Sequence, residues 1–344
     1  NRVFIGTDNR LNACALGNPF DWTSSSSLST DAWYASNFLN SSATITGAEK
    51  YAGGVLIHRS GEDTSYLTGE NPSTFALDPV SNVGAVNPLA VNDHDLYQFF
   101  FTYADEGYGV YPFERNQINN TLKLSKEISR FIKPAFKQLD LTKLNDIFVL
   151  PNTTGGLNEI WFHFPMKDKP NNSVFWIYDL VSECWFKRVQ QKVNCACIFD
   201  GKFLTGSADG KILQEEAGNT FDGQAITGFF ETPWIDFGIR SRDKQLEDVY
   251  SLYSSKRNHK FDWYWFYDND ITVFDYENIE AMCNEDLIWG SSNWGEKSWS
   301  ADQSLNELLP KPNAFQSIKG KAVFGSSQDF GIDKIEMLNV EVTA

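Results

Sequence analysis

The feature that most constrains the fold is a pair of short aromatic strands joined by a tight turn. Residues 173–188, "SVFWIYDLVSECWFKR", run as an apolar strand into Asp179 and return through Trp185 and Phe186. Aromatic and β-branched residues favour strands. Aromatic residues make up 15% of the chain, with 27 Phe, and there are only 3 Met and few Ala-rich runs. This composition disfavours a helical bundle and allows the hairpin to recur.

Hairpins of this kind do recur along the first two-thirds of the chain. Residues 95–103, "DLYQFFFTY", form one strand, and Asp-Gly steps at Asp200-Gly201 and Asp209-Gly210 separate later apolar runs, which is a strong hairpin signal. The runs are nearly continuous in apolar residues, as expected where both faces of a sheet are covered. Radial repetition of small antiparallel units, each roughly 35–50 residues, is a β-propeller. We predict five blade-like units, near residues 1–22, 50–80, 84–113, 145–179 and 184–216.

Two regions depart from this pattern. Within residues 114–142, apolar residues stand at helical spacing around a possible N-cap at Ser125, namely Leu124, Ile128, Phe131 and Ile132. We therefore predict a short inserted helix that Pro134 ends or kinks. From residue 227 the strands become longer and heavily aromatic. The sequence therefore predicts an all-β chain, with a β-propeller-like domain of short four-stranded blades at 1–226 and a C-terminal β-sandwich domain at 227–344.

Charge and cysteine content limit the partners. The net charge of −16 disfavours a role in gripping nucleic acid, because an acidic surface repels phosphates, although DNA can slide past such a surface. No apolar run is long enough to span a bilayer, so no stable membrane association is expected. The odd count of five Cys without a CxxC motif, including Cys195 and Cys197, favours buried reduced thiols over a zinc site.

The sequence offers few groups for catalysis. There are only four His, and "NDHD" at 92–95 gathers Asp93, His94 and Asp95, which suits either a metal or acid–base site, or a solvated turn. The turn is favoured, because adjacent residues of an extended chain rarely point at one centre. No nucleophile elbow, P-loop or dinucleotide fingerprint occurs. We therefore assign no catalytic, cofactor-binding or metal-binding residue and expect no cofactor.

Carboxylates at the ends of the predicted strands raise a glycosidase alternative. Propeller glycosidases use inward carboxylates from several blades, and the candidates here are Asp95, Asp179, Asp200 and Asp209. Asp179, Asp200 and Asp209 fall at turns, which Asp commonly stabilises. Glycoside hydrolysis is therefore kept as a second alternative.

Two clusters are candidate partner contacts. Trp289, Trp294 and Trp299 lie in a polar loop, where exposed indoles can stack on sugar rings or anchor a partner, or can fold back onto the sandwich. The run "RSRDK" contributes Arg240, Arg242 and Lys244, which either contact DNA or an acidic neighbour, or form a solvated hinge between the domains.

Several local patterns, in order along nearly the whole chain, resemble the tail nozzle, or packaged-DNA stabilisation, proteins of short-tailed bacteriophages. The patterns are "RVFIGT" with "ALGNPFDWT", "LIHRSGEDTSYLTGENPSTFAL", "VGAVNPLAV" with "YGVYPF", "VFWIYDLVSECWFKR", and "ETPWIDFG" followed by a basic cluster. The Ser-rich and Trp-rich loops have no counterpart in this resemblance.

The resemblance implies a structural virion protein, made in the host bacterial cytoplasm and present as six copies around the tail axis. It would extend the DNA channel below the portal and adaptor, retain the packaged genome until ejection, and have no enzymatic activity. Its implied partners are the adaptor, a tail fibre or spike, a needle or plug, and double-stranded DNA that passes without specific binding. The alternative function is a receptor- or glycan-binding β-propeller module.

Overall fold

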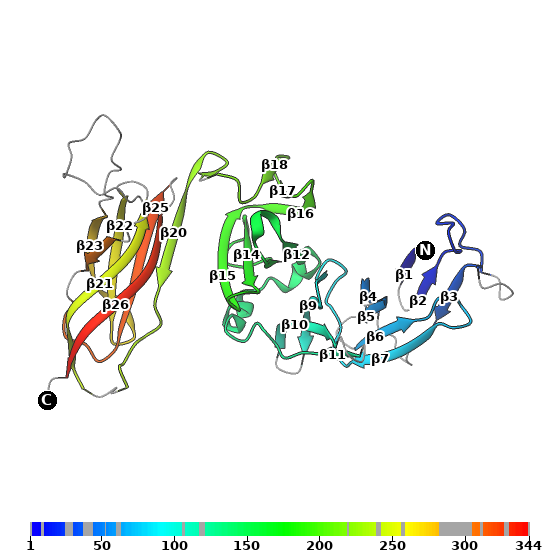
Figure 1. The fold of residues 1–344 in the computed structure, drawn as a ribbon, viewed down its shortest axis with the longest axis horizontal. Coiled ribbons are helices and arrows are strands. Elements are labelled where there is room, and N and C mark those ends of the chain that lie inside the picture. Colours follow the sequence, from blue (N-terminus) through cyan, green and yellow to red (C-terminus); the bar gives the residue numbers. More distant parts are fainter. Residues whose placement is uncertain are drawn as a thin grey trace, which may run out of the picture. The chain divides into compact units, whose positions relative to one another are not determined.

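The computed structural model describes residues 2–7, 10–24, 30–36, 44–51, 53–59, 63–104, 107–116, 121–218, 220–238, 242–255, 259–281, 305–309, 312–326 and 330–342. The chain divides into two compact units, Asn1–Glu216 and Ala217–Ala344. Figure 1 shows both units built of strands with only short helical turns. The prediction of an all-β chain is confirmed.

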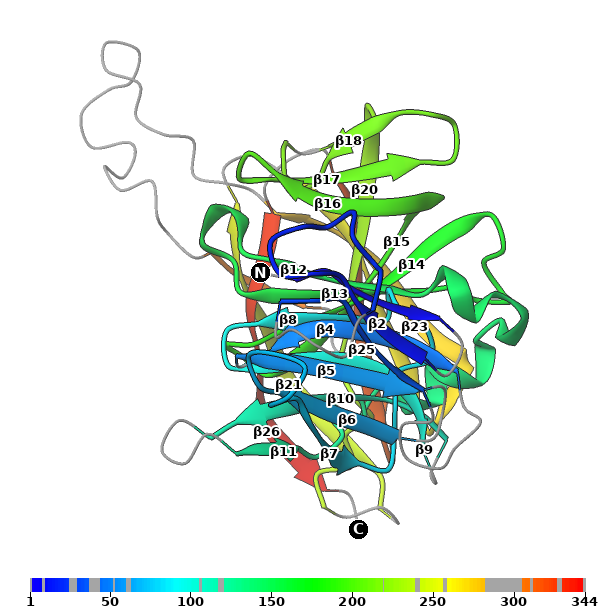
Figure 2. The same ribbon diagram turned by 90° about the vertical axis from the view of Figure 1, so that its right-hand side faces the viewer.

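The first unit contains five antiparallel sheets, and within each sheet the strands lie in chain order. We call these sheets blades 1 to 5. Blades 2, 3 and 4 have four strands, and blades 1 and 5 have three among the described residues. Figure 2 shows β4 to β7 of blade 2 side by side. The strands are β1 (Phe4–Thr7), β2 (Arg10–Ala13) and β3 (Trp33–Ser36); β4 (Ile45–Tyr51), β5 (Gly54–Arg59), β6 (Asp63–Thr68) and β7 (Ala76–Ser81); β8 (Val91–His94), β9 (Tyr97–Ala104), β10 (Gly107–Arg115) and β11 (Leu122–Leu124); β12 (Phe148–Asn152), β13 (Glu159–Phe164), β14 (Asn172–Asp179) and β15 (Cys184–Gln191); and β16 (Val193–Phe199), β17 (Lys202–Ser207) and β18 (Ile212–Gln214).

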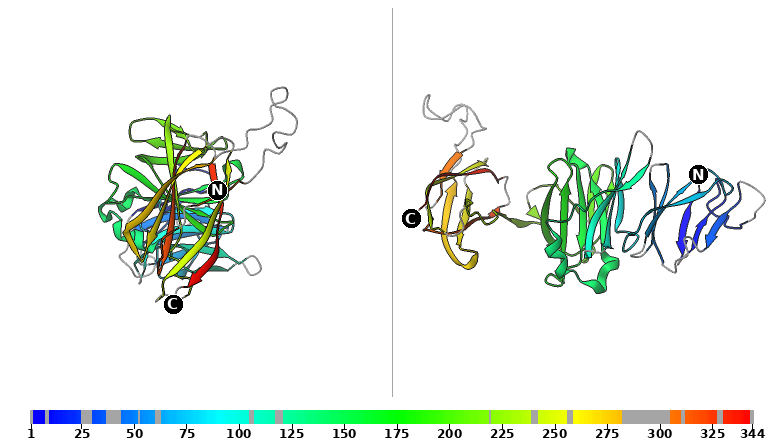
Figure 3. Two further views of the ribbon diagram at one scale, coloured as in Figure 1. Left: turned by 90° about the vertical axis from the view of Figure 1, so that its left-hand side faces the viewer. Right: turned by 90° about the horizontal axis from the view of Figure 1, so that it is seen from below.

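The first strands of the blades lie next to one another. Strand β1 contacts β4, β4 contacts β8, β8 contacts β12, and β12 contacts β16. In a propeller the innermost strand of each blade meets its neighbours in this way. The first strand of each blade is therefore the innermost one, and the first unit is propeller-like. The sheets follow one another as layers in the right-hand view of Figure 3.

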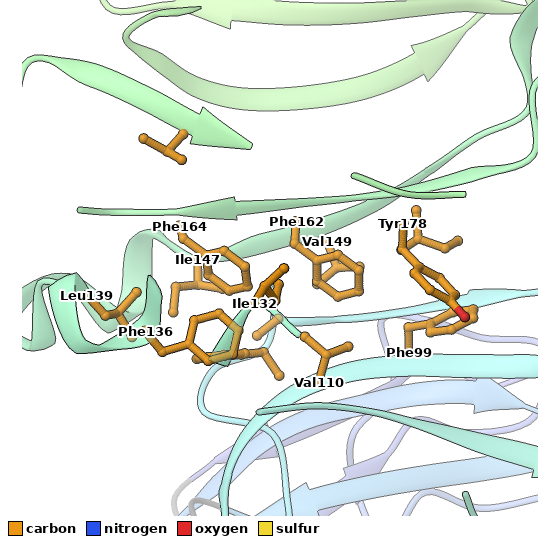
Figure 4. Packing of buried hydrophobic residues seen from close by; sticks show 14 of the residues in the cluster. Phe99, Val110, Ile132, Phe136, Leu139, Ile147, Val149, Phe162, Phe164 and Tyr178 are labelled. Carbon is orange, nitrogen blue, oxygen red and sulfur yellow. The ribbon is translucent and has the colours of Figure 1, made fainter. Parts of the chain in front are cut away.

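Each pair of successive blades encloses its own hydrophobic core. Alternation along β9 explains the unbroken run of phenylalanines: Phe100 packs between blades 2 and 3, whereas Phe99 and Phe101 pack between blades 3 and 4. Strand β13 divides in the same way, with Phe162 facing blade 3 and Trp161 facing blade 5. Figure 4 shows the largest core, between blades 3 and 4. Burying a large apolar side chain stabilises the fold by about 1.5–3 kcal/mol. Each blade is therefore stabilised by packing against every blade that adjoins it.

The predicted inserted helix is wrong in kind and position. No helix occupies residues 125–132; two short 3₁₀ helices follow instead, η2 (Lys133–Gln138) and η3 (Leu141–Asp146), and another, η4 (Thr154–Gly156), lies in blade 4. Pro134 stands in the first turn of η2, where its missing N–H costs nothing, and so begins the helix that it was expected to end. Ile132 and Phe136 still bury their side chains, in the core between blades 3 and 4.

The predicted limits of the last two blades were also displaced. The aromatic hairpin at residues 173–188 is formed by β14 and β15, and both strands belong to blade 4. Glu183 adopts a positive φ of 54° in the turn between them. Blade 5 therefore begins at β16, nine residues after the predicted start at Cys184.

The second unit is a β-sandwich of two antiparallel sheets. One sheet has the order β19-β20-β25-β22-β23 and the other β24-β21-β26. Phe261, Trp263 and Trp265 of the first sheet pack with Leu246 of the second in one core. The unit starts at residue 217, ahead of the predicted boundary at 227, so that β20 lies wholly within it. The strands are β19 (Thr220–Phe221), β20 (Gln224–Glu231), β21 (Lys244–Ser255), β22 (His259–Tyr267), β23 (Asp270–Ala281), β24 (Leu305–Leu308), β25 (Ile318–Ser326) and β26 (Phe330–Val342).

Candidate functional site

Two carboxylates lie on neighbouring innermost strands of the propeller-like unit. Glu49 is on β4 and Asp93 is on β8. Alternation places Glu49 on the same face as Tyr51 and Asp93 on the same face as Val91, and both of these neighbours belong to the core between blades 2 and 3. The two carboxylates thus lie on the faces that the blades turn toward each other, at the inner edge of the junction.

The surroundings raise the pKa of the Glu49 carboxyl. Partial burial is the larger cause, and the negative charge of Asp93 is the second. Burial also raises the pKa of Tyr51 to about 12. The Tyr51 hydroxyl donates to the carbonyl oxygens of Leu96 and Phe113, the latter at 3.2 Å. Glu49 therefore holds a proton more readily than an exposed carboxyl does. The neighbouring carboxyl of Asp93 is exposed.

Hydrogen bonds fix the neighbouring inner strands. Asn92 donates from Nδ2 to the Val149 carbonyl across blades 3 and 4, at 3.1 Å. His94 Nε2 donates to Asn158 Oδ1 at 2.6 Å. The segment "NDHD" is therefore an inner strand that ends at His94, followed by Asp95 in the turn at a φ of 53°, with its carboxylate 3.6 Å from His94 Nε2. Asp93 was named from the sequence and Glu49 was missed, because residues 45–51 show no regular alternation of apolar and polar side chains.

The four aspartates considered for glycoside hydrolysis all lie at turns. Asp179 accepts from the Val181 amide and the Ser182 hydroxyl, which lowers its pKa. The Ser207 hydroxyl lowers the pKa of Asp209. Asp200 and Asp95 both adopt a positive φ, of 49° and 53° respectively. The turn interpretation of these residues agrees with their geometry, and Glu49 and Asp93 are the better placed carboxylates.

The basic run is only partly at the surface. Lys244 is fully buried, and its ammonium donates to the carbonyls of Arg242 and Gln316, at 2.9 and 2.8 Å. It is therefore not available to DNA or to an acidic neighbour, nor does it belong to a solvated hinge. Arg242 is exposed. Arg240 and the three tryptophans Trp289, Trp294 and Trp299 lie outside the described residues.

The cysteines differ from expectation. Cys14 is buried, but Cys184, Cys195 and Cys197 are exposed, so burial was the wrong prediction for three of them. Cys195 and Cys197 lie two apart on β16, the first strand of blade 5. Among the described residues no group of three or more His, Cys, Asp or Glu side chains could hold a metal ion.

Buried ionisable groups elsewhere are satisfied by neighbours. Glu215 accepts from Arg188 at 2.7 Å, from Gln190 at 3.0 Å and from Thr205 at 2.6 Å. This network joins the end of the first unit to β15 and β17. Burial lowers the pKa of both His58 and His163, each on the second strand of a blade. These groups hold the blades together, because their polar atoms are directed at the protein rather than at a ligand. In the described part of the chain, no helix is both long and apolar enough to cross a membrane.

Comparison with known proteins finds matches among solved structures only. No family model and no curated protein matches the chain. Among solved structures it is similar to a glycoside hydrolase family 43 arabinoxylan arabinofuranohydrolase from Bacillus subtilis, in complex with cellotetraose, at 7% identity and a TM-score of 0.23. The match covers 98% of this chain and 66% of the enzyme, so the chain spans just under two thirds of the enzyme's length. A likeness this distant carries no argument about activity.

The resemblance to tail proteins implied no enzymatic activity, and this expectation is withdrawn. The structure matched is that of a glycoside hydrolase, so this prediction is not retained. Arabinofuranohydrolase activity is a property of that enzyme and is not transferred to this chain.

Proposed function

We propose that this chain is a structural subunit of a bacteriophage tail, of the nozzle type, that forms part of the wall of a DNA channel. The observation that carries the proposal is the packing of successive blades face to face through separate aromatic cores. A sheet covered on both faces cannot bend without opening a core, and protein cores are close-packed. Such stiffness suits a wall that bears the load of packaged DNA.

Charge supports the same proposal. The chain carries a net charge of −16, and the inner edge of the junction between blades 2 and 3 carries Glu49 and Asp93. Acidic surfaces repel phosphates within a Debye length, about 8–10 Å at physiological salt. Duplex DNA would therefore pass such a wall without sticking to it. Under this proposal the chain assembles as a hexamer in the virion, beneath a portal and adaptor, with fibre or spike and needle or plug proteins as neighbours.

Electron microscopy of negatively stained samples tests the proposal directly. The purified chain is imaged alone and after mixing with a portal–adaptor complex. We expect six-fold rings that extend the channel of that complex. A chain that stays monomeric beside the complex and binds bacterial cells instead contradicts the conduit and supports the receptor-binding alternative.

A second candidate function is glycoside hydrolysis at the inner carboxylates. The specific observation is the raised pKa of Glu49 beside Asp93, since paired carboxyls with different environments can act as acid and as base or nucleophile. We expect Glu49→Gln to lower hydrolysis of a panel of aryl glycosides by roughly 10²–10⁴-fold. The exposed Glu70→Gln is the control and is expected to keep full activity. Absence of turnover by the unmodified chain removes this candidate.

A further inference from the structure

The outer face of the five-stranded sheet in the second unit is unusually aromatic. Along β22, Trp263 and Trp265 are fully buried in the sandwich core, so alternation turns Tyr264 and Phe266 to the opposite face. Strand β23 adds Phe274 and Tyr276, which pair across the strands with Phe266 and Tyr264. Figure 1 shows β20, β25, β22 and β23 side by side in this sheet. We call the solvent side of this sheet the aromatic face.

Four rings of the aromatic face form one continuous platform. The Tyr264 ring lies 5.0 Å from that of Tyr276, 5.7 Å from that of Phe274 and 6.3 Å from that of Phe266, between ring centroids. Phe266 and Phe274 are 5.9 Å apart. Phe274 is 49% and Tyr276 53% exposed. Contiguous exposed aromatic surface on a folded domain marks a binding site more often than a single exposed ring does.

Polar groups at one end of the platform are held ready for hydroxyl groups. Asp262 accepts from the Tyr276 hydroxyl at 2.9 Å and from Asn278 Nδ2 at 2.7 Å, and both bonds fall on Oδ1. No described residue hydrogen-bonds the other oxygen of Asp262. That oxygen and the second amide hydrogen of Asn278 are an acceptor and a donor on the same edge of the rings.

The two cations beside the platform share one carboxylate partner. Lys319 and Lys321 of β25 both pair with Glu231, Lys321 at 3.8 Å. The Lys319 ammonium also lies 5.8 Å from the Phe266 ring centroid and 5.6 Å from that of Trp234. The two lysines are thus flanked by the carboxylates of Glu231 and Asp262, and Lys260 lies on the same face two residues before Asp262 along β22.

We propose that the aromatic face binds an uncharged polysaccharide. The C–H face of a pyranose packs on the negative face of an aromatic ring, and its hydroxyls meet Asp262 and Asn278. Phosphate- or carboxylate-rich polymers are disfavoured, because Glu231 pairs with both Lys319 and Lys321 and Asp262 adds a second negative charge beside the rings. The proposal does not depend on the tail function.

Affinity electrophoresis of the full chain tests this proposal. Gels contain mixed-linkage β-glucan, glucomannan or dextran as uncharged probes, and alginate or duplex DNA as charged ones. We expect retardation by at least one uncharged probe and by neither charged one. Tyr264→Ala and Tyr276→Ala should each weaken binding at least tenfold. Tyr276→Phe, which keeps the ring, should retain most of it.

The control is Tyr103→Ala, which removes a tyrosine of similar exposure, 55%, from the first unit. It should bind as the unmodified chain does, and thermal melting should confirm that each variant is folded. No retardation by any of the three uncharged polysaccharides overturns the proposal. The proposal is also overturned if Tyr264→Ala and Tyr276→Ala bind as tightly as the unmodified chain, or if only alginate or DNA retards the chain.

Discussion

His58 illustrates how a buried polar group is satisfied inside a blade. Its Nδ1 lies 3.0 Å from the Thr64 hydroxyl, which donates to the Val83 carbonyl at 2.7 Å. Nδ1 therefore carries the proton and Nε2 must accept, but Gln98 presents its oxygen there while its amide nitrogen has no partner. Exchanging the two ends of the Gln98 amide satisfies both groups.

The neutral state of His58 predicts acid sensitivity. Burial lowers its pKa from 6.5 to about 4, so below pH 6.5 the unfolded chain binds a proton that the folded chain does not. Stability is therefore lost as pH falls from 6.5 toward 4. Between pH 7 and pH 5 we expect the unmodified chain to lose about 2 kcal/mol more unfolding free energy than His58→Gln, by urea denaturation. Parallel losses in the two proteins would contradict this assignment.

At the level of strands, one glycine decides how closely β25 approaches β22. A Cβ added at Gly320 would lie 2.7 Å from the Trp263 ring and 3.0 Å from that of Trp265, both fully buried. We expect Gly320→Ala to lower the free energy of unfolding by about 1–3 kcal/mol, because neither indole can move aside in the core.

Gly47→Ala is the matched control for that change. Gly47 also lies in a strand, but its nearest neighbours, His58 and Val91, are 3.6 Å from an added Cβ. This variant should be neutral or slightly stabilising, since glycine weakens a strand interior. Chemical denaturation of the two variants in parallel compares them, and equal effects would show that ring contact is not the cause.

Strands also mark where sequence reasoning succeeded and failed. The phenylalanine run at 99–101 correctly indicated a strand covered on both faces, because burial on both sides leaves no polar alternation. The helical spacing after Ser125 was misleading. Ile132 and Phe136 are apolar because they cover blades 3 and 4, and the intervening chain needs no α-helix to bring them there.

Over the whole chain, the two units have separate cores. The four cores between blades fall within Asn1–Glu216, and the sandwich core falls within Ala217–Ala344. We therefore expect residues 217–344 to fold when expressed alone. The measurement is near-ultraviolet circular dichroism, in which Trp263 and Trp265 should keep the signal of packed indoles. A flat spectrum from this fragment would show that its core needs the first unit.

The sequence by itself determined the all-β class, the recurrence of small aromatic sheets and the change to longer strands near residue 227. These properties can be read from short stretches of sequence, because side-chain alternation, turn residues and β propensity depend on residues that are close together in the chain. Only the tertiary structure decided that Glu49 meets Asp93, that Lys244 is buried, and that four rings share one face of the sandwich. Those relations depend on strand register and on packing between sheets, which join residues far apart in the chain and leave no local signal.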